Sequence, residues 1–273
     1  MTVDPEKLRI TADNIRRTTF NAINHAGGGH YGGSLSISEI LACLYFGVMN
    51  VDPENPDDPD RDRFVLSKGH AGPALYTTLA LRGYFPVEDL KQIDKPLSNF
   101  PKHVDRLKLR GIEVSTGPLG QGFSIGCGMA IGLQKFGRPG RVYALLGDGE
   151  LNSGQVWEAV MTAAKYRLGN LVAIVDRNGC QIDGETDDVM PLEPLAPKFA
   201  AFGWGVQEID GHDVEAILEA LRQAQSIPAG PQVIIARTVK GRGVSFMEGR
   251  YEWHSGQVSE EQARQASTEL GSA

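Results

Sequence analysis

Two short polar motifs, each at the end of an apolar run, most constrain how this chain can fold. The Gly-Asp-Gly motif at 147–149 follows the apolar run 142–146, and Asn178 follows the run 171–176. The helical pattern over 155–167 between them predicts one strand–helix–strand unit with parallel strands. Such strands usually lie side by side, and their carboxyl ends then open on one edge of the sheet, where α/β proteins bind ligands.

The side chains at these two strand ends predict a site for a hard cation beside a phosphate. Asp148 would supply carboxylate oxygens and Asn178 an amide oxygen, which are ligands suited to Mg²⁺ or Ca²⁺. The glycines on either side of Asp148 let main-chain N–H groups approach a phosphate. The same residues also fit an ordinary strand–helix turn, with Asp148 as the helix cap and Asn178 in a tight turn. These residues alone leave both interpretations open.

The remaining pattern predicts an α/β fold, with a parallel sheet flanked by helices on both faces. Nearly continuous apolar runs are typical of parallel strands that are covered on both sides, and with two shorter runs they give expected strands at 63–67, 141–146, 171–176, 206–209 and 232–238. The helical patterns cover 7–25, 36–48, 71–82, 119–136 and 213–226, and Pro86 can begin a further helix.

Four glycines inside the helical segment 119–136 predict an unusually close approach by backbone or ligand, because each costs about 1 kcal/mol relative to Ala. We find no internal repeat and no convincing linker in the 273 residues. We therefore expect a single domain over 1–273, in which 259–273 is a polar, helical tail that could dock on a partner or fray.

The charge balance argues against nucleic acid as the main partner, since 27 Lys and Arg face 34 Asp and Glu, for a net charge of −7. An anionic ligand must then be held by local groups such as main-chain N–H, His or a metal. The three widely spaced cysteines suit a reducing compartment. With no signal-peptide pattern and no apolar stretch long enough for a bilayer, we expect a cytoplasmic protein with no membrane partner.

Four further segments, together with the Gly-Asp-Gly and Asn178 pair, resemble the N-terminal, diphosphate-binding domain of transketolase. They are Gly-His-Tyr-Gly-Gly-Ser-Leu at 29–35, Leu-Ser-Lys-Gly-His-Ala at 66–71, Thr-Gly-Pro-Leu-Gly-Gln-Gly at 116–122 and Trp-His-Ser-Gly at 253–256. Their order and spacing follow the family from about residue 25 to 254. The resemblance implies the thiamin diphosphate-binding fold, with thiamin diphosphate and Mg²⁺ (or Ca²⁺) as cofactors.

The resemblance also implies a role for each matching residue. The metal would be held by side-chain oxygens of Asp148 and Asn178 and by the main-chain carbonyl of Cys180. The residues that would bind the cofactor are His70, Gly117, Leu119, Asp148, Gly149, Asn178 and His254. The residues that would act in catalysis, as proton donors or acceptors and as contacts to the sugar, are His30, His70, His103 and His254. For His25 and His212 we keep the ordinary interpretation of a turn or capping residue.

The implied reaction is transfer of a two-carbon ketol unit from a ketose (phosphate) donor to an aldose (phosphate) acceptor. The cofactor would supply the carbanion chemistry, and the protein the orientation and proton transfers. A full transketolase chain carries two more domains, a pyrimidine-binding and a C-terminal one, whereas only a short tail follows His254. We therefore expect the N-terminal subunit of a split transketolase, active only with a partner subunit that carries those domains, in an α₂β₂ heterotetramer.

Three positions depart from the family pattern, and three other functions compete. Ser153 stands where many transketolases have a Glu that helps to link the two active sites, Val104 follows His103 where Pro is common, and Arg177 precedes Asn178 where many thiamin enzymes have a second Asn. The alternatives are the α subunit of a 2-oxo acid dehydrogenase, a non-catalytic subunit that kept the fold, and a nucleotide-binding module. The segments 116–122 and 253–256 argue against the first.

Overall fold

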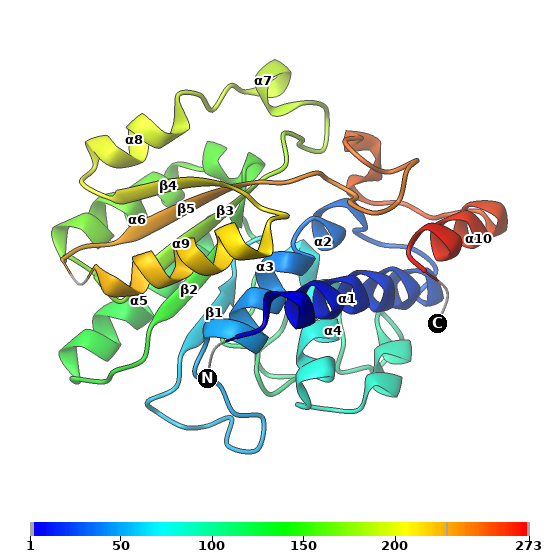
Figure 1. The fold of residues 1–273 in the computed structure, drawn as a ribbon, viewed down its shortest axis with the longest axis horizontal. Helices are drawn as coiled ribbons and strands as arrows, with labels where there is room; N and C mark the ends of the chain where they lie inside the picture. Colours follow the sequence, from blue (N-terminus) through cyan, green and yellow to red (C-terminus); the bar gives the residue numbers. More distant parts are fainter. Residues whose placement is uncertain (1–2, 228, 272–273) are drawn as a thin grey trace.

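The computed structural model describes residues 3–227 and 229–271, and its centre is a five-stranded parallel sheet (Figure 1). The strand order is β1-β2-β3-β5-β4, and every neighbouring pair is parallel. The strands are β1 (Arg63–Leu66), β2 (Val142–Gly147), β3 (Leu171–Arg177), β4 (Gly205–Asp210) and β5 (Gln232–Arg237). The predicted α/β fold is confirmed, and each strand lies within one or two residues of its predicted bounds.

Helices cover both faces of this sheet, because successive strand side chains point to opposite sides. On β2, Tyr143 and Leu145 join one buried cluster, whereas Val142 and Ala144 join the other. The first cluster includes side chains of α1 (Pro5–His25), α3 (Ser38–Cys43), α4 (Gly72–Arg82) and α9 (Val214–Ser226). The second includes side chains of α5 (Gln121–Lys135), α6 (Gly154–Lys165) and α8 (Leu195–Ala201).

Two predicted helices differ from the observed ones. The helix predicted with Ser36 or Ser38 as its cap and Val48 as its end is observed from Ser38 to Val48, but only α3 is α-helical and the last part is a π-helical turn, η1 (Leu44–Val48). A separate short helix, α2 (Gly32–Leu35), precedes it. The segment after Pro86 forms only the 3₁₀ turn η3 (Val87–Gln92). The other short elements are η2 (Gly69–Ala71), η4 (Gly149–Asn152), α7 (Thr186–Val189) and η5 (Tyr251–His254).

The four glycines of α5 do not share one explanation. A Cβ on Gly122 would lie 2.8 Å from the Cα of Ser67, so the predicted close approach is confirmed there. The same atom on Gly126 would make ordinary contact with Val142. Within the described residues nothing lies within 4 Å of that position at Gly128 or Gly132, so the prediction stays untested for these two glycines. Close packing is confined to the first turns of α5, beside the end of β1.

The polar C-terminal segment forms α10 (Glu260–Glu269) and packs against its own chain (Figure 1). Ala266 joins a buried cluster with Phe20 and Met247, and the Glu269 carboxylate accepts hydrogen bonds from the main-chain N–H and the hydroxyl of Ser245, at 2.7 and 2.6 Å. None of the helices in the described part of the chain is both long and apolar enough to cross a membrane.

Candidate active site

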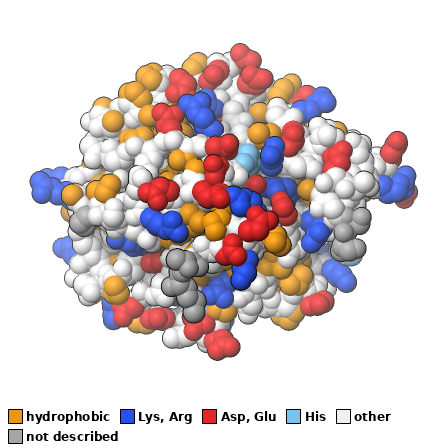
Figure 2. Space-filling model, in the orientation of Figure 1, with side chains coloured by type: hydrophobic (Ala, Val, Ile, Leu, Met, Phe, Trp, Pro, Cys, Tyr) orange, Lys and Arg blue, Asp and Glu red, His pale blue; other side chains and the backbone are white. Residues whose placement is uncertain are grey.

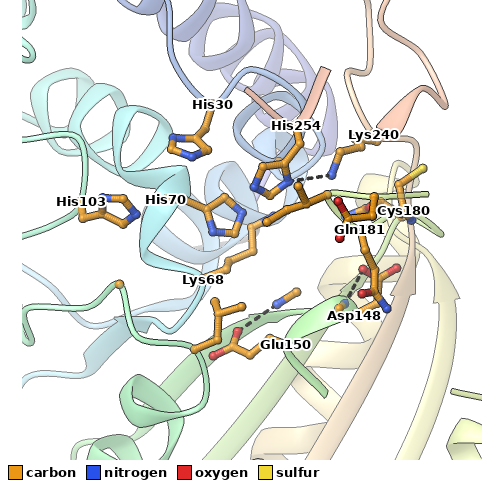
Figure 3. A pocket seen from close by; sticks show the side chains of 18 residues that line it. His30, Lys68, His70, His103, Asp148, Glu150, Cys180, Gln181, Lys240 and His254 are labelled. Carbon is orange, nitrogen blue, oxygen red and sulfur yellow. Dashed lines mark hydrogen bonds between the residues drawn. The ribbon is translucent and has the colours of Figure 1, made fainter. Parts of the chain in front are cut away.

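A cavity of about 300 Å³ opens at the carboxyl ends of the strands, where the loops after β1, β2, β3 and β5 meet (Figure 3). The structure places every predicted site residue in its lining: His30, His70, His103, Gly117, Leu119, Asp148, Gly149, Asn178, Cys180 and His254. His25 and His212, which we interpreted as turn or capping residues, are not among the residues that line it. On the face of the molecule drawn in Figure 2, acidic and basic side chains are interspersed.

The strand register explains why Asp148 and Asn178 come together. Gly147 at the end of β2 pairs with Asp176 near the end of β3. Asp148 and Asn178 therefore follow two neighbouring strand ends. Asp148 is 1% exposed, and its carboxylate accepts hydrogen bonds from the N–H groups of Gly149 at 2.8 Å and of Gly179 at 2.7 Å. The amide oxygen of Asn178 accepts from the N–H of Cys180 at 3.2 Å. Asp148 caps a helical turn and Asn178 lies in a tight turn, and both side chains also line the cavity. The two interpretations of these residues are therefore compatible.

The donor set at this point fits a hard cation. It offers one carboxylate, one amide oxygen and the carbonyl of Cys180, which is the kind of oxygen set that Mg²⁺ and Ca²⁺ take. Within the described residues no cluster of three or more His, Cys, Asp or Glu side chains is arranged to hold a metal, and the expected set contains only one such side chain. Burial, and then the nearby Asp176 carboxylate, raise the pKa of Asp148, so a cation here would also stabilise its ionised form.

Arg177, the residue that departs from the usual Asn, lies against this ligand pair. Its guanidinium donates to Asp148 at 3.2 Å and to the hydroxyl of Thr186 at 2.6 Å. It also reaches the carboxylates of Asp187 at 3.4 Å and Glu193 at 3.5 Å. The arginine thus ties the segment 186–193 to the end of β2.

Four histidines from separate segments meet on the other side of the cavity (Figure 3). The ring of His30 lies 5.3 Å from that of His70, 5.6 Å from His103 and 5.4 Å from His254, measured between ring centroids. The rings of His70 and His254 are 4.9 Å apart. A pair of main-chain hydrogen bonds between Gly29 and Gly256, at 2.9 and 3.0 Å, joins the segments that carry His30 and His254.

The surroundings favour the neutral form of the His30, His70 and His254 imidazoles. Burial, followed by the charges of neighbouring histidines and lysines, lowers the pKa of His30 to about 4. Burial and then Lys240 lower the pKa of His254 to about 3, and burial with Lys68 holds the pKa of His70 well below its ordinary value. A neutral imidazole can both donate and accept a hydrogen bond.

Sequence reasoning missed two buried lysines that line the cavity. Lys68 is 1% exposed and Lys240 is 2% exposed. The ammonium of Lys68 donates to Asp176 at 2.5 Å, and that of Lys240 lies 3.5 Å from Nδ1 of His254 (Figure 3). Both lysines follow predicted strands, 63–67 and 232–238. The rule that α/β proteins bind ligands at the carboxyl ends of their strands could therefore have found them. A net-negative chain therefore does offer local positive charge for an anion.

Glu150 is a further lining residue that sequence reasoning missed. Its buried carboxylate accepts hydrogen bonds from the hydroxyl of Ser67 at 2.5 Å, from the N–H of Gly120 at 2.7 Å and from the N–H of Gly147 at 3.1 Å. Burial raises its pKa. Glu150 thereby joins the ends of β1 and β2 to the turn 117–120. Ser153 packs against the same turn, since a Cβ on Gly120 would lie 2.8 Å from its Oγ.

Comparison with known proteins identifies the family. The family model described as transketolase, thiamine diphosphate binding domain, matches residues 8–273. The 6-deoxy-6-sulfo-D-fructose transketolase subunit SqwG of Clostridium sp. (strain MSTE9) is 49% identical, over 96% of each chain. A subunit of the apulose-4-phosphate transketolase of Phocaeicola vulgatus is 40% identical, over 97% of this chain and 94% of that one.

Longer transketolases match over only part of their length. Human transketolase is 39% identical over 97% of this chain, but the match covers 42% of the human protein. The crystal structure of transketolase from Campylobacter jejuni superposes with a TM-score of 0.92 and 32% identity, over 98% of this chain and 43% of that one. These matches do not favour the alternative of a 2-oxo acid dehydrogenase subunit. The chain belongs to the transketolase family, in which it is an N-terminal, thiamine diphosphate-binding subunit.

Proposed function

We propose that the cavity binds thiamine diphosphate together with Mg²⁺, and that the chain transfers two-carbon ketol units jointly with a partner subunit. The observation that carries the proposal is the convergence of all the predicted residues on one cavity, with oxygen ligands on one side and histidines on the other. The packing of the cavity wall also supports the proposal. A Cβ on Gly33 would lie 3.2 Å from Nε2 of His70 and 3.3 Å from Nζ of Lys68, so the absence of a side chain there leaves these two polar groups room at the cavity.

In this proposal the chain's residues divide between the two ends of the cofactor. Asp148, Asn178 and the carbonyl of Cys180 hold the cation. The N–H of Gly149, together with His70, His254 and the ammonium of Lys240, faces the diphosphate. Gly117 and Leu119 line the aminopyrimidine side. When bound, the cofactor supplies the electron sink for the two-carbon unit.

The remaining histidines serve the sugar. His30 and His103 line the same cavity as the cofactor residues, and His70 and His254 stand between the two groups. A neutral imidazole can hold a sugar hydroxyl and can take or return its proton. Replacing His30 with Asn should therefore lower kcat about 10²- to 10⁴-fold, the range for loss of a general acid or base. His25→Asn, an exposed histidine at the end of α1, is the matched control and should leave kcat unchanged.

We propose that the chain works with a partner subunit. The match covers 42% of human transketolase and 43% of the Campylobacter jejuni transketolase chain. Relatives of this chain's own length are named as subunits. We propose that the partner carries the pyrimidine-binding and C-terminal domains, that the assembly is α₂β₂, and that the chain works in the cytoplasm as one domain over 1–273. Neither nucleic acid nor a membrane is a partner in this proposal.

The names of the relatives suggest the class of substrate. One acts on a sulfonated ketose and others on a ketose phosphate. We infer that the donor is a ketose with a terminal anionic group, and that the 6-deoxy-6-sulfo sugar is the first to test, because that relative has 49% identity. An aldose or aldose phosphate is the acceptor.

The test is reconstitution of the purified chain with its partner chain, thiamine diphosphate and Mg²⁺. Donors to compare are 6-deoxy-6-sulfo-D-fructose, a ketose phosphate and a 2-oxo acid, with release of the shortened aldose or of CO₂ as the readout. We expect ketol transfer that requires both chains, the cofactor and the metal. Full turnover by this chain alone would refute the two-chain proposal, and activity with only the 2-oxo acid would refute ketol transfer.

A further inference from the structure

Asp176 is a buried carboxylate just behind the cavity, and side chains from four segments converge on it. It lies near the end of β3, is 0% exposed and does not line the cavity. The hydrogen-bond donors to its two oxygens are Ser36 Oγ at 2.8 Å, Lys68 Nζ at 2.5 Å, Asn178 Nδ2 at 2.8 Å and the hydroxyl of Thr238. Asn178 and Lys68, which line the cavity, are thereby connected to one residue that does not line it.

The bond from Asn178 fixes which way round its amide group lies. An ionised carboxylate can only accept hydrogen bonds, so the partner of Asp176 must be the NH₂ group and not the amide oxygen. The opposite flip of the Asn178 side chain would bring two oxygens together. The amide oxygen is consequently turned away from Asp176, and it lies where the N–H of Cys180 donates to it at 3.2 Å.

The same carboxylate balances the charge of Lys68. A buried ammonium needs a close partner, and Asp176 supplies it at 2.5 Å. Four hydrogen-bond donors surround the two oxygens of Asp176, so its carboxylate acts as an acceptor on every side. Thr238, two residues before Lys240, anchors the segment that carries the second lysine to the same group.

We propose that Asp176 is a positioning residue of the cofactor site: it orients the amide oxygen of Asn178 toward the cation and holds the ammonium of Lys68 at the cavity floor, without touching either the cation or the cofactor. This inference rests on the proposed function, because it assumes that the cavity takes Mg²⁺ and thiamine diphosphate. Residues that orient metal ligands in this way typically change metal affinity 10- to 100-fold when they are replaced.

Asp176→Asn tests the proposal against a matched control, Asp62→Asn. Asp62 is also buried, but it accepts hydrogen bonds from the N–H groups of Asn50 and Arg141 beside the first residues of β1 and β2, at the opposite end of the sheet. Both variants should lose stability in urea unfolding. Calorimetry then measures the titration of Mg²⁺ into the reconstituted assembly at saturating thiamine diphosphate. We expect a 10- to 100-fold weaker Mg²⁺ affinity for Asp176→Asn and wild-type affinity for Asp62→Asn.

A swapped pair, Asp176→Asn with Asn178→Asp, separates orientation from a general loss of structure. The new amide at 176 can donate to the new carboxylate at 178, but an NH₂ group in the place of Oδ2 no longer accepts from Ser36 and Lys68. We therefore expect partial recovery of Mg²⁺ affinity relative to either single variant. This variant also carries the test if Asp176→Asn does not fold. Wild-type Mg²⁺ affinity in Asp176→Asn, or no recovery in the swapped pair, would overturn the inference. Failure of the wild-type assembly to bind Mg²⁺ or cofactor would instead overturn the proposed function.

Discussion

The environment of His30 and His254 in the cavity determines the charge of their rings. Burial and neighbouring charges lower the pKa of His30 to about 4 and that of His254 to about 3, from an ordinary value of 6.5. Lys240, close to His254, adds to this effect. These rings are therefore neutral at neutral pH. A protonated cluster would repel itself and the buried lysines, so the neutral form is part of what allows the rings to lie so close together.

The lowered pKa values of His30 and His254 make the free energy of unfolding depend on pH. Between pH 6.5 and about 4, the unfolded chain binds more protons at these histidines than the folded chain, so stability must fall as the pH decreases through that window and must be unaffected by them above it. We expect the urea midpoint to fall from pH 7 to pH 5, and to fall less in His254→Asn. His25→Asn, outside the cavity, should follow the wild type. An unchanged pH slope in His254→Asn would contradict the pKa shift.

The residues that sequence reasoning found and those it missed differ in physical character. Asp148, Asn178 and His70 stand in turns that follow strand ends, which sequence patterns reveal. His30, His103 and His254 were predicted from the family resemblance. Lys68 and Lys240 were missed because lysine is almost never fully buried, so composition alone suggests an exposed side chain. The role of Asp176 was also hidden, since its donors come from segments far apart in the sequence.

At the scale of elements, the start of α5 depends on close packing that only glycine permits. A Cβ on Gly122 would lie 2.8 Å from Ser67 Cα and 2.9 Å from Thr116 Cγ2, with backbone on one side. Gly122→Ala should therefore destabilise the fold by about 1–3 kcal/mol, as overpacking does. Gly128→Ala on the same helix meets open space and should stabilise it by up to about 1 kcal/mol. Urea unfolding checks both, and a Gly122→Ala variant as stable as Gly128→Ala would contradict this packing.

The sequence predicted strands better than the helical segment 36–48. Parallel strands covered on both faces appear as short apolar runs with clear ends, whereas Ile40, Leu41 and their neighbours are buried on all sides and show no polar face. Without amphipathic periodicity, the choice between α-helix and π-helical turn depends on the surrounding packing. Helix periodicity alone also does not say which face of α5 meets another backbone, so it could not single out Gly122 among the glycines of this helix.

At the scale of the whole molecule, one side of the cavity is lined by residues of the segment after β5, namely Lys240 and His254. The chain leaves β5, carries Lys240 into the cavity, and returns through η5 with His254, so residues 240–258 lie over the strand ends (Figures 1 and 3). The family resemblance predicted the role of His254, but not what holds this segment in place. Main-chain bonds to Gly29 fix one side, and contacts with α10 fix the other.

We expect α10 to act on the cavity through this segment. The Glu269 carboxylate binds both the N–H and the hydroxyl of Ser245, whereas Glu260 on the same helix is exposed and has only a 3.7 Å ion pair with Arg264. Glu269→Ala should therefore speed amide exchange in 240–258 and weaken cofactor affinity severalfold, with a loss of about 1 kcal/mol or less in unfolding free energy. Glu260→Ala is the control. If removal of 259–273 left both exchange and affinity at wild-type values, α10 would be a surface helix without influence on the site.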